Sequence, residues 1–198
     1  MTNTATLAPG PGHSRPGRPP TITRERIADA GMVMGLPRMT FVGVAALLGV
    51  SHMALYKHVA NLAALKLLVA EAIFTRWQLP DTGNDDLEHF LLRFSASLRE
   101  LVKAFPGLAP YLIRRKVATP AMLASIAAHQ AEVAHLYGIS IDRARWLLST
   151  VAFHCIALAD TVYAVADEAR EEDDEELEAE FDLGMHALII GALAMQPR

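Results

Sequence analysis

Apolar residues recur at helical spacing on both sides of Gly49. The segment before it has apolar residues at positions i, i+3, i+4 and i+7 of a short helix: Phe41, Val44, Ala45 and Leu48. Gly49 stands where a tight turn requires a positive φ, which glycine adopts without a Cβ clash. A second helix is expected from His52 to His58, with Ser51 placed to cap it and Leu55 on its inner side. This pattern predicts a helix-turn-helix, a unit that lays its second helix in a DNA major groove.

The outer face of the second helix carries the side chains that would meet DNA. His52, Met53, Tyr56 and Lys57 share an arc of roughly 140° on a helical wheel, opposite Leu55. An ordinary helical hairpin in a protein core would show part of this pattern. Here all the required positions agree, which favours the DNA-binding interpretation.

Further helices are expected along the rest of the chain, which shows no strand alternation and no internal repeat. They are predicted over residues 23–35, 62–78, 85–105, a short stretch ending near 116, 119–137, 140–167 and a last stretch ending near 195. The sequence thus predicts an all-α protein in three parts. A disordered basic arm (1–20) precedes a three-helix helix-turn-helix DNA-binding head (21–66), which is followed by a larger helical ligand-binding and dimerisation body (67–198).

Two apolar stretches raise the question of a membrane. Residues 146–166 are long enough to span a bilayer, but they contain His154 and Asp160, which a lone spanning helix would hold at considerable cost. Residues 183–195 are too short to span. We therefore expect no membrane partner and interpret both as helices buried partly by a second subunit. Two such helices per subunit would form a four-helix bundle in a homodimer.

The net charge of −4 hides an asymmetry between the two ends of the chain. Residues 1–66 carry seven basic and two acidic side chains, a net charge of +5, so the remainder carries −9. A basic N-terminal part on an acidic body is typical of a protein that binds DNA at one end. The chain has one cysteine, Cys155, expected to be buried, and its Pro- and Gly-rich start lacks the apolar run of a secretory signal, which favours a cytoplasmic location.

The first twenty residues cannot pack a core, because five prolines and three glycines interrupt them. They space Arg15 and Arg18 along an extended backbone. One interpretation is an arm that enters a minor groove or lies along phosphates, and the other is a solvated leader.

Some residues suggest competing chemistry. His129, Glu132 and His135 lie on one predicted helix, but a di-iron carboxylate bundle needs a second Glu-x-x-His that the sequence lacks. The ten acidic residues between Asp167 and Glu180 are not spaced as a calcium loop, so we interpret them as a solvated loop and helix start. With no phosphate-binding loop, nucleophile elbow or catalytic carboxylate pair in the sequence, we expect no enzyme, cofactor or metal site.

Residues 23–65 resemble the DNA-binding domain of the TetR family of transcriptional regulators, and within it the tetracycline-repressor-like branch. The resemblance rests on Leu48-Gly49-Val50-Ser51 and Leu55-Tyr56-Lys57-His58-Val59, supported by Thr23, Ile27, Gly35 and Leu65. Residues 181–191 are similar to the last, dimer-forming helix of that branch. The resemblance implies that Thr40 contacts backbone phosphate, and that Tyr56 and His58 contact phosphates or sugars. It places Ser51, His52, Met53, Ala54 and Lys57 at the groove.

The chain departs from the family pattern beside these contacts. Phe41-Val42 removes any arginine–guanine contact from the first helix of the unit, and Leu62 replaces a lysine usual in the family. Each lost phosphate contact weakens a salt-dependent part of the binding energy. Our hypothesis is that Arg15, Arg18 and Arg38 restore part of it.

The expected function is that of a ligand-responsive regulator, acting as a repressor that binds a palindromic operator as a homodimer. A small hydrophobic or aromatic effector would release it from DNA by binding a mostly apolar cavity. The large aromatic or polar side chains of the middle helices are the expected lining of that cavity: Phe94, Leu98, Tyr111, His129, Trp146 and His154. The alternative is an all-α ligand-binding or interaction protein whose head has lost specific DNA binding.

Overall fold

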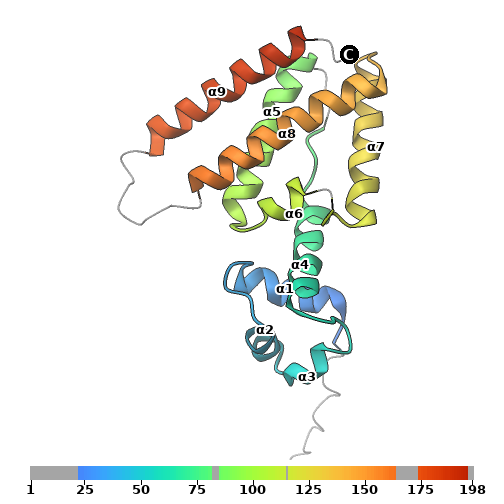
Figure 1. Cartoon of the computed structure of the whole chain (residues 1–198), viewed down its shortest axis with the longest axis vertical. Coiled ribbons are helices and arrows are strands. Elements are labelled where there is room, and N and C mark those ends of the chain that lie inside the picture. Colours follow the sequence, from blue (N-terminus) through green and yellow to red (C-terminus); the bar gives the residue numbers. More distant parts are fainter. Residues whose placement is uncertain (1–21, 82–84, 115, 164–173, 196–198) are drawn as a thin grey trace, which may run out of the picture.

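The computed structural model describes residues 22–81, 85–114, 116–163 and 174–195, and every regular element among them is a helix. Nine helices are seen in this part of the chain (Figure 1): α1 (Arg24–Met34), α2 (Phe41–Leu48), α3 (His52–Leu55), α4 (Leu62–Arg76), α5 (Leu87–Ala104), α6 (Ala109–Ile113), α7 (Pro120–Leu136), α8 (Ile141–Tyr163) and α9 (Asp174–Ala194). The predicted all-α class is confirmed. Residues 1–20, with Arg15 and Arg18, and part of the acidic run lie outside the described residues.

A small head of α1, α2 and α3 forms one end of the molecule, and α4 runs from it into the body of α5 to α9 (Figure 1). Fully buried side chains of the head include Ile27, Val44, Leu55 and Leu65. The same apolar cluster takes in residues further along α4 and two body residues, Leu101 and Leu108. Packing therefore continues across the expected boundary at residue 66, and the division into domains stays a prediction.

Local signals set the ends of most helices as expected. Gly49 adopts the left-handed conformation with φ 67°, and the amide of Val50 behind it donates to the carbonyl of Ala45 at 3.0 Å. Thr119 caps α7, because its hydroxyl oxygen accepts a hydrogen bond from the amide of Met122, and Pro120 occupies the first helical position.

Helix α3 differs from its prediction. It covers only His52–Leu55 instead of continuing to His58, and residues 56–58 form a turn. The amide of His58 donates to the carbonyl of Leu55 in an i→i+3 bond, which tightens the chain away from α-helical geometry. The expected side-chain cap from Ser51 is also wrong, since that side chain makes no capping hydrogen bond.

The central helix of the body is α8. Its inner face packs against α5 and α9 through fully or nearly fully buried residues such as Ala144, Val151, Cys155 and Ala159. Among the described residues it is the one helix long and apolar enough to cross a bilayer by length and composition, a test that the core helix of a soluble protein also passes. A third of that apolar stretch is buried inside the protomer.

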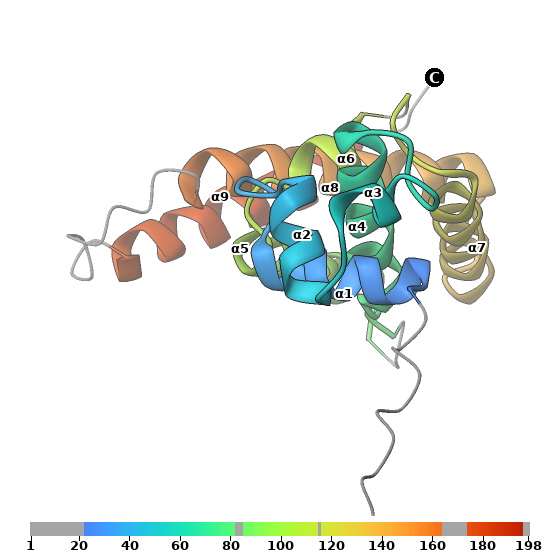
Figure 2. The same ribbon diagram turned by 90° about the horizontal axis from the view of Figure 1, so that it is seen from below.

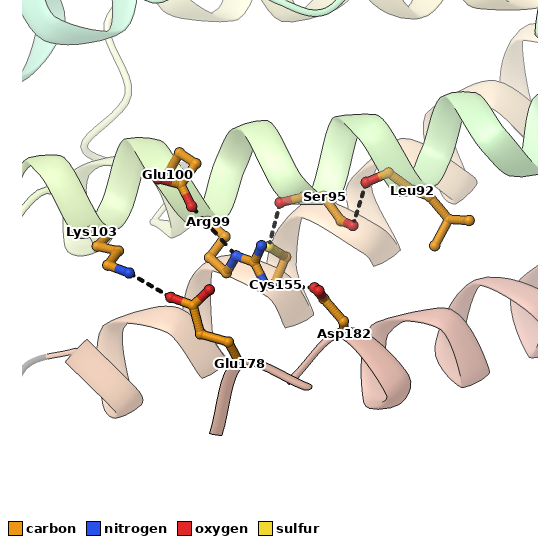
Figure 3. Close-up of polar contacts among 8 residues, drawn as sticks. All are labelled: Leu92, Ser95, Arg99, Glu100, Lys103, Cys155, Glu178 and Asp182. Atoms are coloured by element: carbon orange, nitrogen blue, oxygen red, sulfur yellow. Dashed lines mark hydrogen bonds and ion pairs between the residues drawn. The ribbon is translucent and has the colours of Figure 1, made fainter. Parts of the chain in front are cut away.

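Polar contacts fasten the last helix to α5 (Figure 3). Arg99 Nη1 donates to Asp182 Oδ1 at 2.5 Å, and Lys103 Nζ donates to Glu178 Oε1 at 2.5 Å. The second bond raises the pKa of Lys103 and lowers the pKa of Glu178. The buried thiol of Cys155 donates to the carbonyl of Ser95 at 3.1 Å, and burial raises its pKa to about 12. Cys155 is therefore an inert core thiol at neutral pH.

Gly31 allows α1 to approach α4 closely. A Cβ added there would overlap Cγ2 of Val69 and lie 3.1 Å from Cε of Met39. We expect Gly31→Ala to lower the free energy of unfolding by about 1–2 kcal/mol, because overpacking of about 1–3 kcal/mol exceeds a helix-propensity gain of about 1 kcal/mol. Urea unfolding measures it. The control is Gly43→Ala, where the two nearest atoms belong to the flexible end of Met34 and the next, Thr40 Oγ1, lies 3.0 Å away. Equal stability of both variants would contradict the close approach.

Candidate nucleic-acid interface

Helices α2 and α3 form the end of the head farthest from the body (Figures 1 and 2), and most of the residues predicted to contact DNA belong to these helices or flank them. Arg38 precedes α2 in the α1–α2 loop, on the side of the head that meets the body. Most of the predicted residues have exposed side chains: Arg38, Thr40, Ser51, His52, Met53, Tyr56 and Lys57. Ala54 and His58 are partly buried. The predicted outward face of the second helix is thus exposed, opposite the buried Leu55.

Two hydrogen bonds position the start of α2 and the end of the α3 turn. Thr40 Oγ1 accepts from the amide of Gly43 at 3.0 Å, so the threonine caps α2 and keeps its own O–H free to donate. Arg24 Nη1 donates to the carbonyl of His58 at 3.1 Å, which ties the turn after α3 to α1. Both bonds fix the backbone next to residues that the resemblance predicted to contact phosphate.

An aromatic stack joins α2 to the segment after α3. The rings of Phe41 and Tyr56 lie parallel, with centroids 4.5 Å apart and an interplanar angle of 12°. The sequence pattern placed Phe41 on the inner face of α2 and Tyr56 on the outer face of the second helix, and gave no signal that they touch. The stack restrains Tyr56, so its hydroxyl is held at the edge of the exposed surface.

The described head is basic. Residues 22–66 hold five Lys or Arg side chains against Glu25 and Asp29, a net charge of +3. Asp29 is paired with Arg76 at 2.6 Å, and no acidic residue occurs between residues 30 and 70. Helices α2 and α3 and the segments that flank them therefore contribute no carboxylate to this surface, which suits the binding of a polyanion.

No family model and no curated protein sequence matches the chain. Solved structures do match. A variant of TetR from Acinetobacter baumannii AYE in complex with minocycline is 23% identical, with a TM-score of 0.71 over 86% of this chain and 96% of that one. ActR from Streptomyces coelicolor in complex with actinorhodin is 20% identical, with a TM-score of 0.66 over 88% and 98%. BioQ with its double-stranded DNA operator is 18% identical, with a TM-score of 0.66 over 88% and 100%.

The chain has the TetR fold. This confirms the fold expected from the resemblance of residues 23–65, and it extends the likeness to the body, where the sequence showed nothing specific between residues 80 and 140. Of the three residues of this TetR-fold chain that depart from the family pattern, Val42 and Leu62 are exposed on the head, whereas Phe41 is partly buried.

The six residues expected to line an effector cavity have different surroundings in the TetR-fold body. Phe94, Leu98 and His129 are buried, and the rings of Phe94 and His129 have centroids 5.8 Å apart. Tyr111 packs towards the head cluster, Trp146 lies under Arg143, and His154 is exposed. Their role in ligand binding stays a prediction.

His129 is the buried titratable side chain of this group. Its Nε2 atom is buried without a hydrogen-bond partner, and its Nδ1 atom lies 4.0 Å from Glu132 Oε2. Burial lowers the pKa of His129, against the opposing effect of Glu132, so the neutral imidazole is favoured. It also borders a polar cavity of about 280 Å³ with Asp81, Ser125 and Glu132. Within the described part of the chain no three metal-ligating side chains gather, here or elsewhere.

A second cavity, of about 260 Å³, lies where the head meets the body. We call it the junction cavity. Its lining comes from the end of α1, the α1–α2 loop, α4 and the end of α5: Met32, Met34, Gly35, Leu36, Pro37, Arg38, Val69, Ile73, Ala104, Phe105 and Pro106. Sequence reasoning missed it, because residues 35–38 and 104–106 are distant in the chain and neither carries a ligand-binding pattern.

Proposed function

We propose that this protein is a ligand-responsive transcriptional regulator that represses by binding a palindromic DNA operator as a homodimer. The observation that carries the proposal is the exposed, carboxylate-free face of α2 and α3 on a TetR-fold chain. BioQ, a protein of this fold, is solved with its DNA operator, and ActR is solved with a small molecule. A cytoplasmic location and the lack of enzymatic activity belong to the same proposal.

The exposed apolar residues of α8 and α9 support the homodimer. Phe153 and Leu158 on α8, and Leu183 and Ile190 on α9, have solvent-exposed side chains. Gly184 and Gly191 lie on the exposed side of α9, and a Cβ added at either would meet nothing within 4 Å. An apolar surface with small residues allows a second pair of helices to pack closely, which would complete a four-helix bundle.

For the effector, the junction cavity offers the most direct coupling to the head. Apolar side chains dominate its lining, with Arg38 at its edge, so it suits a compact hydrophobic or aromatic molecule. A ligand there would touch α1 and the loop that leads into α2, and also the end of α5. If the effector favours one orientation of the head and the operator requires another, effector binding lowers the affinity for DNA. By the same coupling, DNA binding lowers the affinity for the effector.

The test of the function is binding to the DNA upstream of the protein's own gene, measured by fluorescence anisotropy at several salt concentrations. A regulator should prefer one palindromic fragment over a shuffled fragment of the same composition, with two protomers per site. Equal affinity for all fragments would instead favour the alternative, an all-α ligand-binding or interaction protein. The same assay with residues 1–20 deleted tests the arm, since loss of Arg15 and Arg18 should lower the salt slope.

Lys57 gives a sharper prediction for the interface. We expect Lys57→Ala to weaken binding to all sequences alike and to lower the salt slope by about 1 per head, because one phosphate contact is lost. Lys66→Ala is the control, since Lys66 lies on α4, outside α2 and α3. An unchanged slope for Lys57→Ala would remove this residue from the interface.

Ala104 tests the junction cavity. It lines the cavity and is exposed, so Ala104→Trp should fill part of the space with little cost in folding. We expect the variant to bind operator as wild type but to respond to effector at about tenfold higher concentration, which corresponds to about 1.4 kcal/mol. Ser125→Trp, at the His129 cavity, is the matched control. If Ser125→Trp weakened the response to effector and Ala104→Trp did not, the effector site would instead be the His129 cavity.

A further inference from the structure

Two exposed apolar side chains stand on the surface that the proposed function turns towards DNA. Val42 on α2 is 67% exposed and Met53 on α3 is 62% exposed. Neither contributes to the buried core of the head. Each exposes apolar surface that could be buried against a partner.

A rigid aromatic pair links the two positions. Val42 follows Phe41 in α2, and Met53 lies one helical turn before Tyr56. Because Phe41 and Tyr56 stack at 4.5 Å, the backbone segments that carry Val42 and Met53 are held in a fixed relation. They would therefore approach a groove together.

Most of the polar side chains that usually read bases are missing from this segment, and Lys57 is the exception. Residues 40–58 contain no Arg, Asn or Gln, the residues that bind guanine or adenine through paired hydrogen bonds. Thr40, Ser51, His52, Tyr56 and Lys57 are the exposed polar side chains of this stretch, and Thr40 Oγ1 already caps α2. Apolar contacts should therefore contribute a larger part of the recognition of bases.

We propose that the head reads its operator through the C5-methyl groups of thymines, with Val42 and Met53 as the residues that bind them. The proposal rests on the DNA binding proposed above. The thymine methyl is an apolar group presented in the major groove, and apolar side chains distinguish it from the other base edges. The operator half-site should therefore contain at least two A·T pairs at the positions facing Val42 and Met53.

The charge of the surface favours DNA over an apolar protein partner. No Asp or Glu occurs from residue 30 to residue 70, and the cations of Arg38 and Lys57 lie on either side of the apolar pair in the sequence. A phosphate backbone beside methyl groups is complementary to such a surface in both charge and polarity.

The experiment replaces each thymine of the operator in turn by deoxyuridine, which removes only the methyl group, and measures Kd with the wild-type dimer. We expect a loss of about threefold to tenfold at two positions in each half-site, since burial of one methyl contributes about that factor. Val42→Ala should abolish the methyl dependence at one position, and Met53→Ala at the other. Val33→Ala, an exposed apolar residue on α1, is the matched control and should leave both dependences intact.

The outcomes separate the two proposals. An operator bound with sequence preference but without any effect of deoxyuridine would overturn methyl reading and leave the proposed function standing. Methyl dependence that persists in both alanine variants would also overturn the assignment to Val42 and Met53. A protein that prefers no sequence at all would overturn the proposed function together with the inference.

Discussion

Asp182→Ala is expected to lower the free energy of unfolding by about 2–3 kcal/mol. The substitution leaves the Arg99 guanidinium, which is 10% exposed, without the carboxylate that accepts from Nη1 at 2.5 Å. Removing one partner of a fully buried pair costs about 3–5 kcal/mol, and we expect less here because Asp182 itself is 65% exposed. Arg99 Nε is buried without a hydrogen-bond partner, but Glu100 Oε1 lies 3.7 Å from it and keeps part of the charge compensated, which also limits the loss.

The matched variant is Arg99→Met. It removes the buried charge and keeps an unbranched side chain against Phe181, whose ring lies 5.2 Å from the guanidinium carbon. Asp182 then becomes an ordinary solvated carboxylate, so we expect a change within about 1 kcal/mol. Urea unfolding at one fixed protein concentration measures both variants. If Arg99→Met proved as damaging as Asp182→Ala, the pair would be a net source of stability and not a compensated buried charge.

Local patterns predicted the parts of the fold that depend on nearby residues. Gly49, Leu55 and the Thr119-Pro120 start of α7 took the predicted conformation or burial, since a turn, a buried position and a helix cap depend mainly on a few neighbouring residues. The predicted length of α3 was wrong, because the end of a helix is not fixed by the apolar pattern alone. The apolar pattern continues beyond Leu55, but the chain tightens into a turn there, and helix ends are the least certain feature of such patterns.

Contacts between distant segments could not be predicted in this way. The Phe41–Tyr56 stack joins residues fifteen positions apart, and the junction cavity joins the α1–α2 loop to the end of α5. The ligand residues show the same limit. His154 and Cys155 are neighbours in a helix apolar on most sides, yet the thiol is buried and the imidazole is exposed. To decide which of the two side chains faces the core, one must know from which direction α5 packs on α8.

The exposed face of α9 leads to the largest expected effect on function. Leu183 is 73% exposed and Ile190 is 51% exposed, one on each side of the small residues Gly184 and Ala187. If this face joins two protomers, Ile190→Arg places a charge in an apolar interface, while the folded protomer tolerates it at an exposed position. We expect a monomer by analytical ultracentrifugation.

Loss of the dimer should weaken operator binding by about 100-fold or more. Two linked heads gain about 10²–10⁴ in avidity on a palindrome, because binding of the first holds the second near its half-site. Leu123→Arg, at an exposed position on α7, is the control and should stay dimeric with full affinity. A dimeric Ile190→Arg variant would move the interface off this face of α9. A monomeric variant that keeps wild-type affinity would show that one head suffices, and the palindrome would then have no physical basis in this protein.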